Sequence, residues 1–93
     1  MKQYLIYAYD FTDSEALSRR LKVRPEHFEK ARQMKAAGTF VIGGAILNDA
    51  GQMIGSTMVL QFEDEDGLNN WKGSEPYILG RVWEKIEIRP FKV

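Results

Sequence analysis

The spacing of hydrophobic positions changes several times along this chain, and each change predicts a different element. The apolar run Tyr4–Tyr9 predicts a buried strand that ends at Asp10. Polar residues follow, and Ser14 or the aspartate before it is expected to cap a short helical turn that reaches Leu21. The N-terminal segment therefore predicts a strand followed by a brief helical stretch.

Helical spacing governs the next segment. Apolar residues recur at three-residue intervals from Phe28 to Met34, with charged residues between them, until Gly38 ends the pattern. Because proline is favoured at the first helical position, the main helix is expected to begin at Pro25. His27, the only histidine, would then lie in the first turn, where the positive end of the helix dipole disfavours the imidazolium.

Strand patterns return in the second half of the chain. The β-branched run Phe40–Ile42 predicts a second strand, the polar segment Asn48–Gly51 a turn, and the alternating segment Ser56–Phe62 a third strand. Asp64 is the expected N-cap of a second helix, which a Gly-Ser-Glu-Pro segment ends, and Val82–Arg89 predicts the last strand.

This order, β-α-β-β-α-β, predicts an α+β, ferredoxin-like fold in which both helices cover one face of an antiparallel sheet. In the last strand, alternation directs Ile86 and Ile88 towards the core and Trp83 towards the open face, together with Thr57 and Val59. A contiguous apolar patch is costly in water, so two such sheets are expected to pack face to face as a homodimer or a higher homo-oligomer. The alternative is an isolated surface tryptophan.

Length and composition narrow the possible chemistry. The 93 residues are expected to form one domain, residues 1–93, and the 13 basic residues balance 13 acidic ones, so neither nucleic acid nor a membrane is an expected partner. The chain has no cysteine, which excludes disulfides, and with only one histidine the usual zinc sites are excluded as well. No metal cofactor is expected, and neither is haem, flavin or nicotinamide: Gly43-Gly44 lacks dinucleotide-loop spacing, and the single histidine has no other haem-binding signature beside it. No targeting segment is recognised, which favours a cytoplasmic protein.

Topology is expected to bring polar residues from distant segments to one edge of the sheet. Asp10 ends the first strand where the helix of His27 begins, and the loop at Asn48-Asp49 opens at the same edge. With Asp10 accepting from one ring nitrogen, the other nitrogen of His27 would act as a general base or acid on a small-molecule substrate. The expected substrate-binding residues are Arg24, for a carboxylate or enolate oxygen, and Ser74, Glu75 and Tyr77, for hydrogen bonds or a second acid.

Each of these residues also has a plainer interpretation. A lone histidine in a helix is more often structural or exposed to solvent than catalytic. Asp10 is equally explained as a turn residue, and Arg24 as a solvated charge. The pairing of Asp10 with His27 is therefore one hypothesis among the alternatives that the residues alone allow.

Several motifs in the same register resemble the YciI-like family. The matching motifs, which span nearly the whole chain, are Tyr9-Asp10, Arg24-Pro25-Glu26-His27, Gly43-Gly44, Ser74–Gly80 and Ile88–Lys92. Members of this family are small dimeric α+β-barrel proteins related to muconolactone isomerases. The resemblance implies an active site with a His/Asp pair at His27 and Asp10. One characterised relative is a dehydrochlorinase that acts on a chlorinated hydroxyhydroquinone.

Two positions depart from the family pattern, because Ala45 replaces a usual proline after Gly44, and Glu75 replaces a usual aspartate before Pro-Tyr. The leading hypothesis is a cofactor-independent enzyme in which a His/Asp pair moves a proton during elimination or isomerisation of a small cyclic organic substrate. A non-catalytic ligand-binding module and a dimerisation protein are the alternatives.

Overall fold

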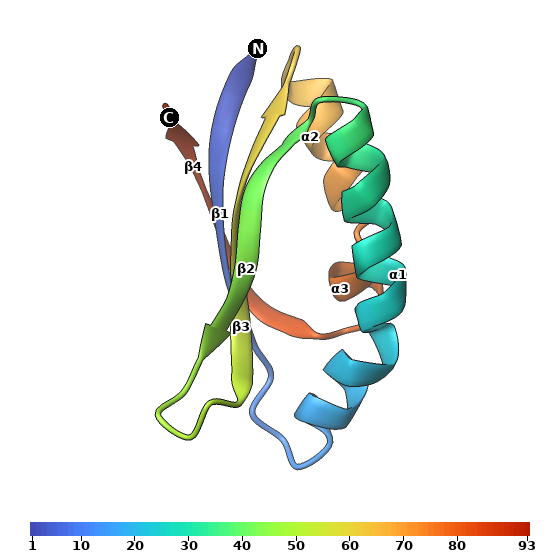
Figure 1. The fold of residues 1–93 in the computed structure, drawn as a ribbon, viewed down its shortest axis with the longest axis vertical. Coiled ribbons are helices and arrows are strands. Elements are labelled where there is room, and N and C mark those ends of the chain that lie inside the picture. Colours follow the sequence, from blue (N-terminus) through green and yellow to red (C-terminus); the bar gives the residue numbers. More distant parts are fainter.

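The computed structural model describes residues 1–93 and has the ferredoxin-like order of elements that the sequence predicts (Figure 1). The elements are β1 (Lys2–Asp10), α1 (Ala16–Ala36), β2 (Phe40–Leu47), β3 (Met53–Phe62), α2 (Glu65–Lys72), α3 (Pro76–Leu79) and β4 (Trp83–Phe91). All strand pairs are antiparallel, in the order β2-β3-β1-β4, and the helices lie on one face of this sheet. No helix combines the length and hydrophobicity that crossing a membrane requires.

Helix α1 is longer than the sequence pattern predicts. The expected break at Pro25 is wrong, because one continuous helix runs through this proline. Because proline has no backbone N–H, the Leu21 carbonyl lacks its usual helical donor. Pro25 is exposed and Leu21 is 51% exposed, so this carbonyl lies on a side of the helix where water can donate to it instead. His27 therefore lies in the middle of a helix, and the expected influence of the helix N-terminus on its ring does not apply.

The face of the sheet beneath the helices carries the core. Alternate residues of the two central strands face the helices in register, with Tyr4 opposite Leu60 and Ile6 opposite Met58. These residues are buried, and the same cluster includes Trp71 of α2, Tyr77 of α3 and Trp83 of β4. The period-two alternation predicted for the third strand is thus present, and the first strand, which the sequence predicts as a buried apolar run, alternates as well, since one face of each strand is buried against the helices.

The predicted position of Trp83 on the open face is wrong. Tyr9 pairs with Lys85 whereas Asp10 pairs with Trp83, so Glu84 is an extra residue in β4 and forms a bulge. The bulge reverses the alternation and turns Trp83 towards the helices, where it is only 4% exposed. Both Val82 and Trp83 are therefore buried, although strict alternation allows only one of them to be.

The open face of the sheet remains rich in apolar residues without Trp83. Tyr7 and Tyr9 of β1 are partly exposed on it, their hydroxyls hydrogen-bonded at 2.7 Å, and Thr57 of β3 lies opposite Tyr7. Ile42 of the edge strand β2 pairs with Val59 on this face and is 65% exposed. The face left uncovered by helices therefore exposes several large side chains.

Replacing Pro25 by alanine tests the continuity of α1. Alanine restores the backbone donor to a helix interior, so the free energy of unfolding is expected to rise by about 1–2 kcal/mol, after allowance for the freer unfolded chain. Chemical denaturation measures this change, and Glu26→Ala, at the adjacent exposed position, is the control. An unchanged or lower stability in Pro25→Ala would instead fit a proline at the start of a separate helix.

Candidate active site

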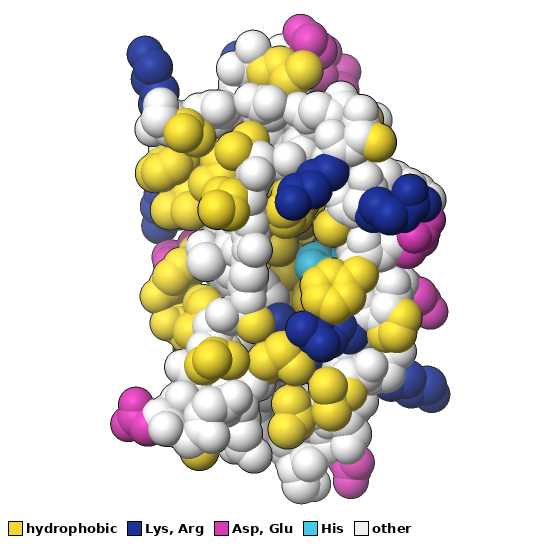
Figure 2. All heavy atoms as spheres, viewed as in Figure 1, with side chains coloured by type: hydrophobic (Ala, Val, Ile, Leu, Met, Phe, Trp, Pro, Cys, Tyr) yellow, Lys and Arg dark blue, Asp and Glu magenta, His cyan; other side chains and the backbone are white.

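A cavity of about 470 Å³ opens between helix α1 and the edge strand β2. In Figure 2 this opening faces the viewer, with the single histidine of the chain visible inside it and Lys or Arg side chains above and below. Helix α1 contributes Arg24, His27 and Phe28 to the walls, β2 contributes Gly43 and its neighbours, and α3 contributes Tyr77. The cavity has the size of a small-molecule site.

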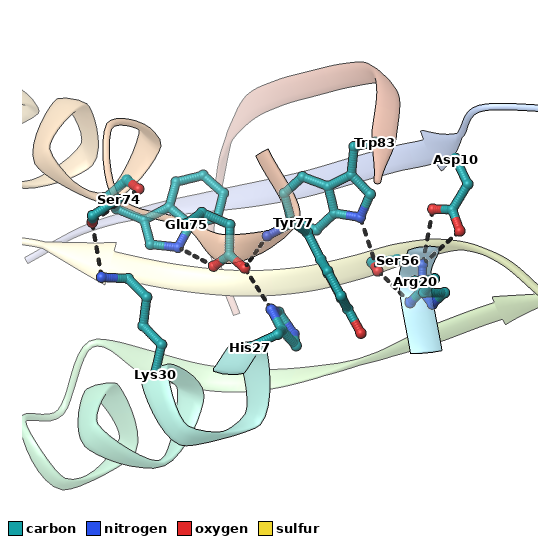
Figure 3. A network of polar contacts seen from close by, with 10 residues as sticks. Asp10, Arg20, His27, Lys30, Ser56, Ser74, Glu75, Tyr77 and Trp83 are labelled. Atoms are coloured by element: carbon teal, nitrogen blue, oxygen red, sulfur yellow. Dashed lines mark hydrogen bonds and ion pairs between the residues drawn. The ribbon is translucent and has the colours of Figure 1, made fainter. Parts of the chain in front are cut away.

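His27 is held by a buried carboxylate. The Nδ1 atom of His27 lies 2.6 Å from Oε1 of Glu75, and Glu75 is only 2% exposed (Figure 3). Glu75 caps helix α3 by accepting from the Tyr77 amide at 3.2 Å, with Pro76 at the first helical position, and it accepts from the Trp71 indole at 3.1 Å. Three donors thus satisfy the carboxylate and fix its position.

This arrangement selects one tautomer of the neutral imidazole. A carboxylate only accepts hydrogen bonds, so Nδ1 of His27 carries the proton and Nε2 is left with a lone pair. No side chain or backbone group bonds to Nε2, and the only buried side-chain nitrogen or oxygen without a partner belongs to Arg20, so Nε2 keeps access to solvent. His27 therefore presents a free acceptor nitrogen in a residue that lines the cavity.

Tyr77 lies between two basic side chains. Its ring stacks on the His27 imidazole at 4.0 Å between centroids, and the Arg20 guanidinium carbon lies 4.7 Å from the Tyr77 centroid. Burial raises the pKa of the Tyr77 hydroxyl, while the positive charges of Arg20 and Arg24 oppose the shift. With its pKa raised, the Tyr77 hydroxyl keeps its proton at neutral pH. It has no hydrogen-bond partner in the protein, so its O–H is free to donate beside the cavity.

Asp10 pairs with Arg20 and makes no hydrogen bond to His27. The Arg20 Nη1 atom donates to both Asp10 oxygens, at 2.8 and 3.0 Å, and Nη2 donates to the Ser56 hydroxyl at 2.7 Å. The Trp83 indole donates to the same hydroxyl at 3.2 Å (Figure 3). The expected direct Asp10–His27 pair is thus absent from this structure, since the continuous α1 helix places Arg20 against Asp10.

The remaining predicted residues divide between the cavity and the surface. Arg24 lines the cavity, with its guanidinium carbon 4.5 Å from the Phe28 centroid. Ser74 does not line the cavity; its exposed hydroxyl accepts from Lys30 at 2.8 Å. The Asn48 side chain closes its own turn by accepting from backbone amides, so it is also separate from this site.

Two residues of the site do not stand out in the sequence, namely Arg20 and Ser56, which both line the cavity. Arg20 precedes His27 by seven residues, which is two helical turns, so this spacing is a usable signal once α1 is taken as continuous. Ser56 gives no such signal, because only strand pairing brings it opposite Ala8 and beside Arg20. The fold contains no cluster of three His, Asp or Glu side chains with metal-binding geometry.

The fold and the cavity define a small ferredoxin-like α+β protein with a histidine–carboxylate pair at a ligand-sized site. The family model of the YCII-related domain matches residues 2–92, and the chain belongs to this family. It is 34% identical over 95 residues to Protein YciI of Escherichia coli O6:H1, covering 96% of this chain and 95% of that protein. It is also 31% identical to an uncharacterised protein of Haemophilus influenzae, with the same coverage.

Solved structures share the fold. The 5-chloro-2-hydroxyhydroquinone dehydrochlorinase TftG of Burkholderia phenoliruptrix AC1100, in complex with 2,5-dihydroxybenzoquinone, superposes with a TM-score of 0.81 at 21% identity, covering 97% of this chain and 93% of that one. An antibiotic biosynthesis monooxygenase superposes with a TM-score of 0.61 at 12% identity, covering 100% and 98%. At these identities the likeness concerns the fold.

The pH dependence of stability tests the environment of Asp10. Burial raises the pKa of its carboxyl, and the Arg20 charge opposes the shift. The folded pKa therefore exceeds the unfolded value of about 3.9, and the contribution of Asp10 to stability is present below that value and lost as pH rises through the folded pKa. The stability of the wild type relative to Asp10→Asn is expected to fall between about pH 3 and 7, as measured by chemical denaturation.

Asp13 provides a control of opposite sign. Hydrogen bonds from Arg19 lower the pKa of Asp13, so the stability of the wild type relative to Asp13→Asn should rise over the same range, by a small amount because the pair is exposed. A rise for both aspartates would mean that the Arg20 ion pair outweighs desolvation at Asp10.

Proposed function

We propose that this protein is a cofactor-independent enzyme that transfers a proton during elimination or isomerisation of a small cyclic organic substrate. The observation that carries the proposal is the 2.6 Å contact between His27 Nδ1 and the buried Glu75 carboxylate, with Nε2 left free at the cavity. A histidine oriented in this way is a general base whose imidazolium form is stabilised by the neighbouring carboxylate. In this proposal Glu75, rather than Asp10, orients the ring.

The other residues have distinct roles in the proposed reaction. The Nε2 atom of His27 removes a proton from a ring carbon, and the electron pair of that C–H bond moves towards an oxygen substituent of the substrate. The Tyr77 hydroxyl and the Arg24 guanidinium donate to the negative oxygen that forms. Isomerisation ends when His27 returns the proton to another carbon, and elimination ends when a leaving group departs with its bonding electron pair.

Asp10 has a positioning role in this proposal. Its carboxylate holds Arg20, and the Arg20 guanidinium lies against the face of Tyr77 opposite to His27. Asp10 thereby acts on the His27 ring through two intervening side chains. The sequence-based expectation of an acid and a histidine at one site is retained, with a different carboxylate in contact with the imidazole.

The dehydrochlorinase of the same fold supports the reaction class. That protein is named as a dehydrochlorinase of 5-chloro-2-hydroxyhydroquinone, and its structure holds 2,5-dihydroxybenzoquinone. A cavity of about 470 Å³ is large enough for a single-ring compound of this kind. For this chain, both the substrate size and the proton transfer are inferences from the His27 geometry and from that likeness.

Hydrogen–deuterium exchange tests the proposal even when the product is unidentified. A panel of hydroxylated and chlorinated cyclic compounds is incubated with the protein in D2O, and mass spectrometry follows deuterium uptake at carbon and ion chromatography follows chloride release. Because proton abstraction depends on His27, His27→Gln is expected to lower the rate of deuterium uptake or chloride release by about 10²–10⁴-fold. Glu75→Gln should lower it by a smaller factor, since only the orientation and charge partner of the ring are lost.

Ser74→Ala is the matched control, because Ser74 adjoins Glu75 in sequence but its hydroxyl lies outside the cavity. It is expected to retain the wild-type rate. Equal rates in the wild type and His27→Gln for every active compound would overturn the proposal. Binding without exchange or release would favour the alternative, a ligand-binding module.

We also propose that two copies pack through their open sheet faces as a homodimer. The proposal rests on the large side chains that this face exposes, among them Tyr7 and Ile42. Light scattering coupled to size exclusion is expected to give twice the mass of the chain. Tyr7→Glu should shift the protein to monomer, because the dimer would bury an unpaired glutamate charge in its interface. Leu21→Glu, on the exposed side of α1, should leave the mass unchanged. A monomeric wild type would contradict this proposal.

A further inference from the structure

We propose that the ligand of this cavity is a planar ring compound that enters already carrying an ionised oxygen group, which Arg24 binds. This inference rests on the site of the proposed function and adds the substrate class. It does not depend on catalysis, because a charged ligand is recognised by binding alone. The supporting observations are the basic side of α1 that faces the cavity, the unpaired Arg24 and the flat aromatic walls.

The cavity-facing side of helix α1 is basic where a helix of a small domain is usually apolar. The residues Arg20, Arg24, His27, Ala31 and Lys35 are separated by three or four positions, so they share one side of the helix, and all five line the cavity. Such a stripe normally packs against the sheet. In this protein the stripe faces the open cavity, so this side of α1 gives the cavity a basic wall and does not complete an apolar core.

No acidic residue lines this cavity, although the whole chain has as many acidic as basic residues. The Arg20 charge is balanced by Asp10, and Arg32 pairs with Glu29. Arg24 and Lys35 have no carboxylate within ion-pair distance. Two unpaired basic side chains therefore outnumber the single Glu75 carboxylate that lies behind His27, and this local excess of positive charge favours an anionic ligand.

Arg24 is well placed to bind that anion. Its guanidinium lies over the Phe28 ring at 4.5 Å, which restricts its plane without using its N–H donors, and it makes no hydrogen bond within the protein. A planar guanidinium with free donors matches the two oxygens of a carboxylate and also binds a phenolate oxygen. Arg24 precedes His27 by three residues, so the two side chains are neighbours on the same side of α1.

The walls of the cavity favour a flat ring. Phe28, Phe40 and Tyr77 provide aromatic surface, and Gly43 of β2 provides backbone without a side chain. A Cβ atom at Gly43 would approach Phe40 to 2.7 Å and the Met58 Cβ to 2.9 Å, so this position has no room for a larger residue. A planar ring is the shape that packs well between aromatic faces and bare backbone.

Calorimetric binding of two probe pairs tests this inference. Benzoate is compared with the neutral benzamide, and 4-nitrophenolate, at a pH above its pKa, with the neutral 4-nitroanisole. At least one anion is expected to bind about tenfold or more tightly than its neutral partner, because charge-assisted hydrogen bonds are worth that factor. Selective binding of benzoate identifies a carboxylate site, selective binding of 4-nitrophenolate identifies a phenolate site, and either result supports the proposal.

Variants assign the preference to Arg24. Arg24→Gln is expected to lower anion affinity by about tenfold or more while changing neutral affinity little, and Arg24→Lys should restore part of the difference. Arg19→Gln is the matched control, because Arg19 also lies on α1 but does not line the cavity and pairs with Asp13. Circular dichroism confirms that each variant is folded, and the wild-type comparison stands without any variant.

His27→Gln separates this inference from the proposed function. That variant is expected to lose proton transfer but to keep the preference for anions, because Arg24 is unchanged. Equal affinities for charged and neutral partners, no binding of any probe at millimolar concentration, or an unaltered preference in Arg24→Gln would each overturn the inference. None of these results would exclude proton transfer on a neutral substrate.

Discussion

The buried carboxylate of Glu75 is the constraint on which the rest of the site depends. A charged group in a position that is 2% exposed requires donors, and it obtains them from three helices: His27 of α1, Trp71 of α2 and the Tyr77 amide of α3. The same three bonds join the helices to one another. The stabilisation of this charge and the orientation of the histidine ring are therefore one arrangement.

A second polar network joins the helix layer to the sheet. Arg20 of α1 donates to Asp10 of β1 and to Ser56 of β3, and Trp83 of β4 donates to the same serine. The Tyr77 ring lies between this network and the His27–Glu75 pair. Each network satisfies a buried charge of its own, so His27 does not have to neutralise the carboxylate that ends β1.

The identities of the site residues were more predictable than their pairing. The expected topology brought the segment of Glu75 and Tyr77 to the same sheet edge as His27, and both side chains do contact the His27 ring. The partner of His27 was not predictable, since Asp10 and Glu75 are both carboxylates within reach of a histidine in a ferredoxin-like fold. Competition from Arg20 for Asp10 decides between them.

The sequence by itself determined the α+β class, the order of the strands and main helices and the helix-facing residues of β3, because period-two and helical spacing are local properties of a chain. Only the tertiary structure decided that α1 continues through Pro25 and that a bulge at Glu84 turns Trp83 inward. Both outcomes depend on packing against distant segments, whose free energy outweighs the local preference of a proline or of strict strand alternation.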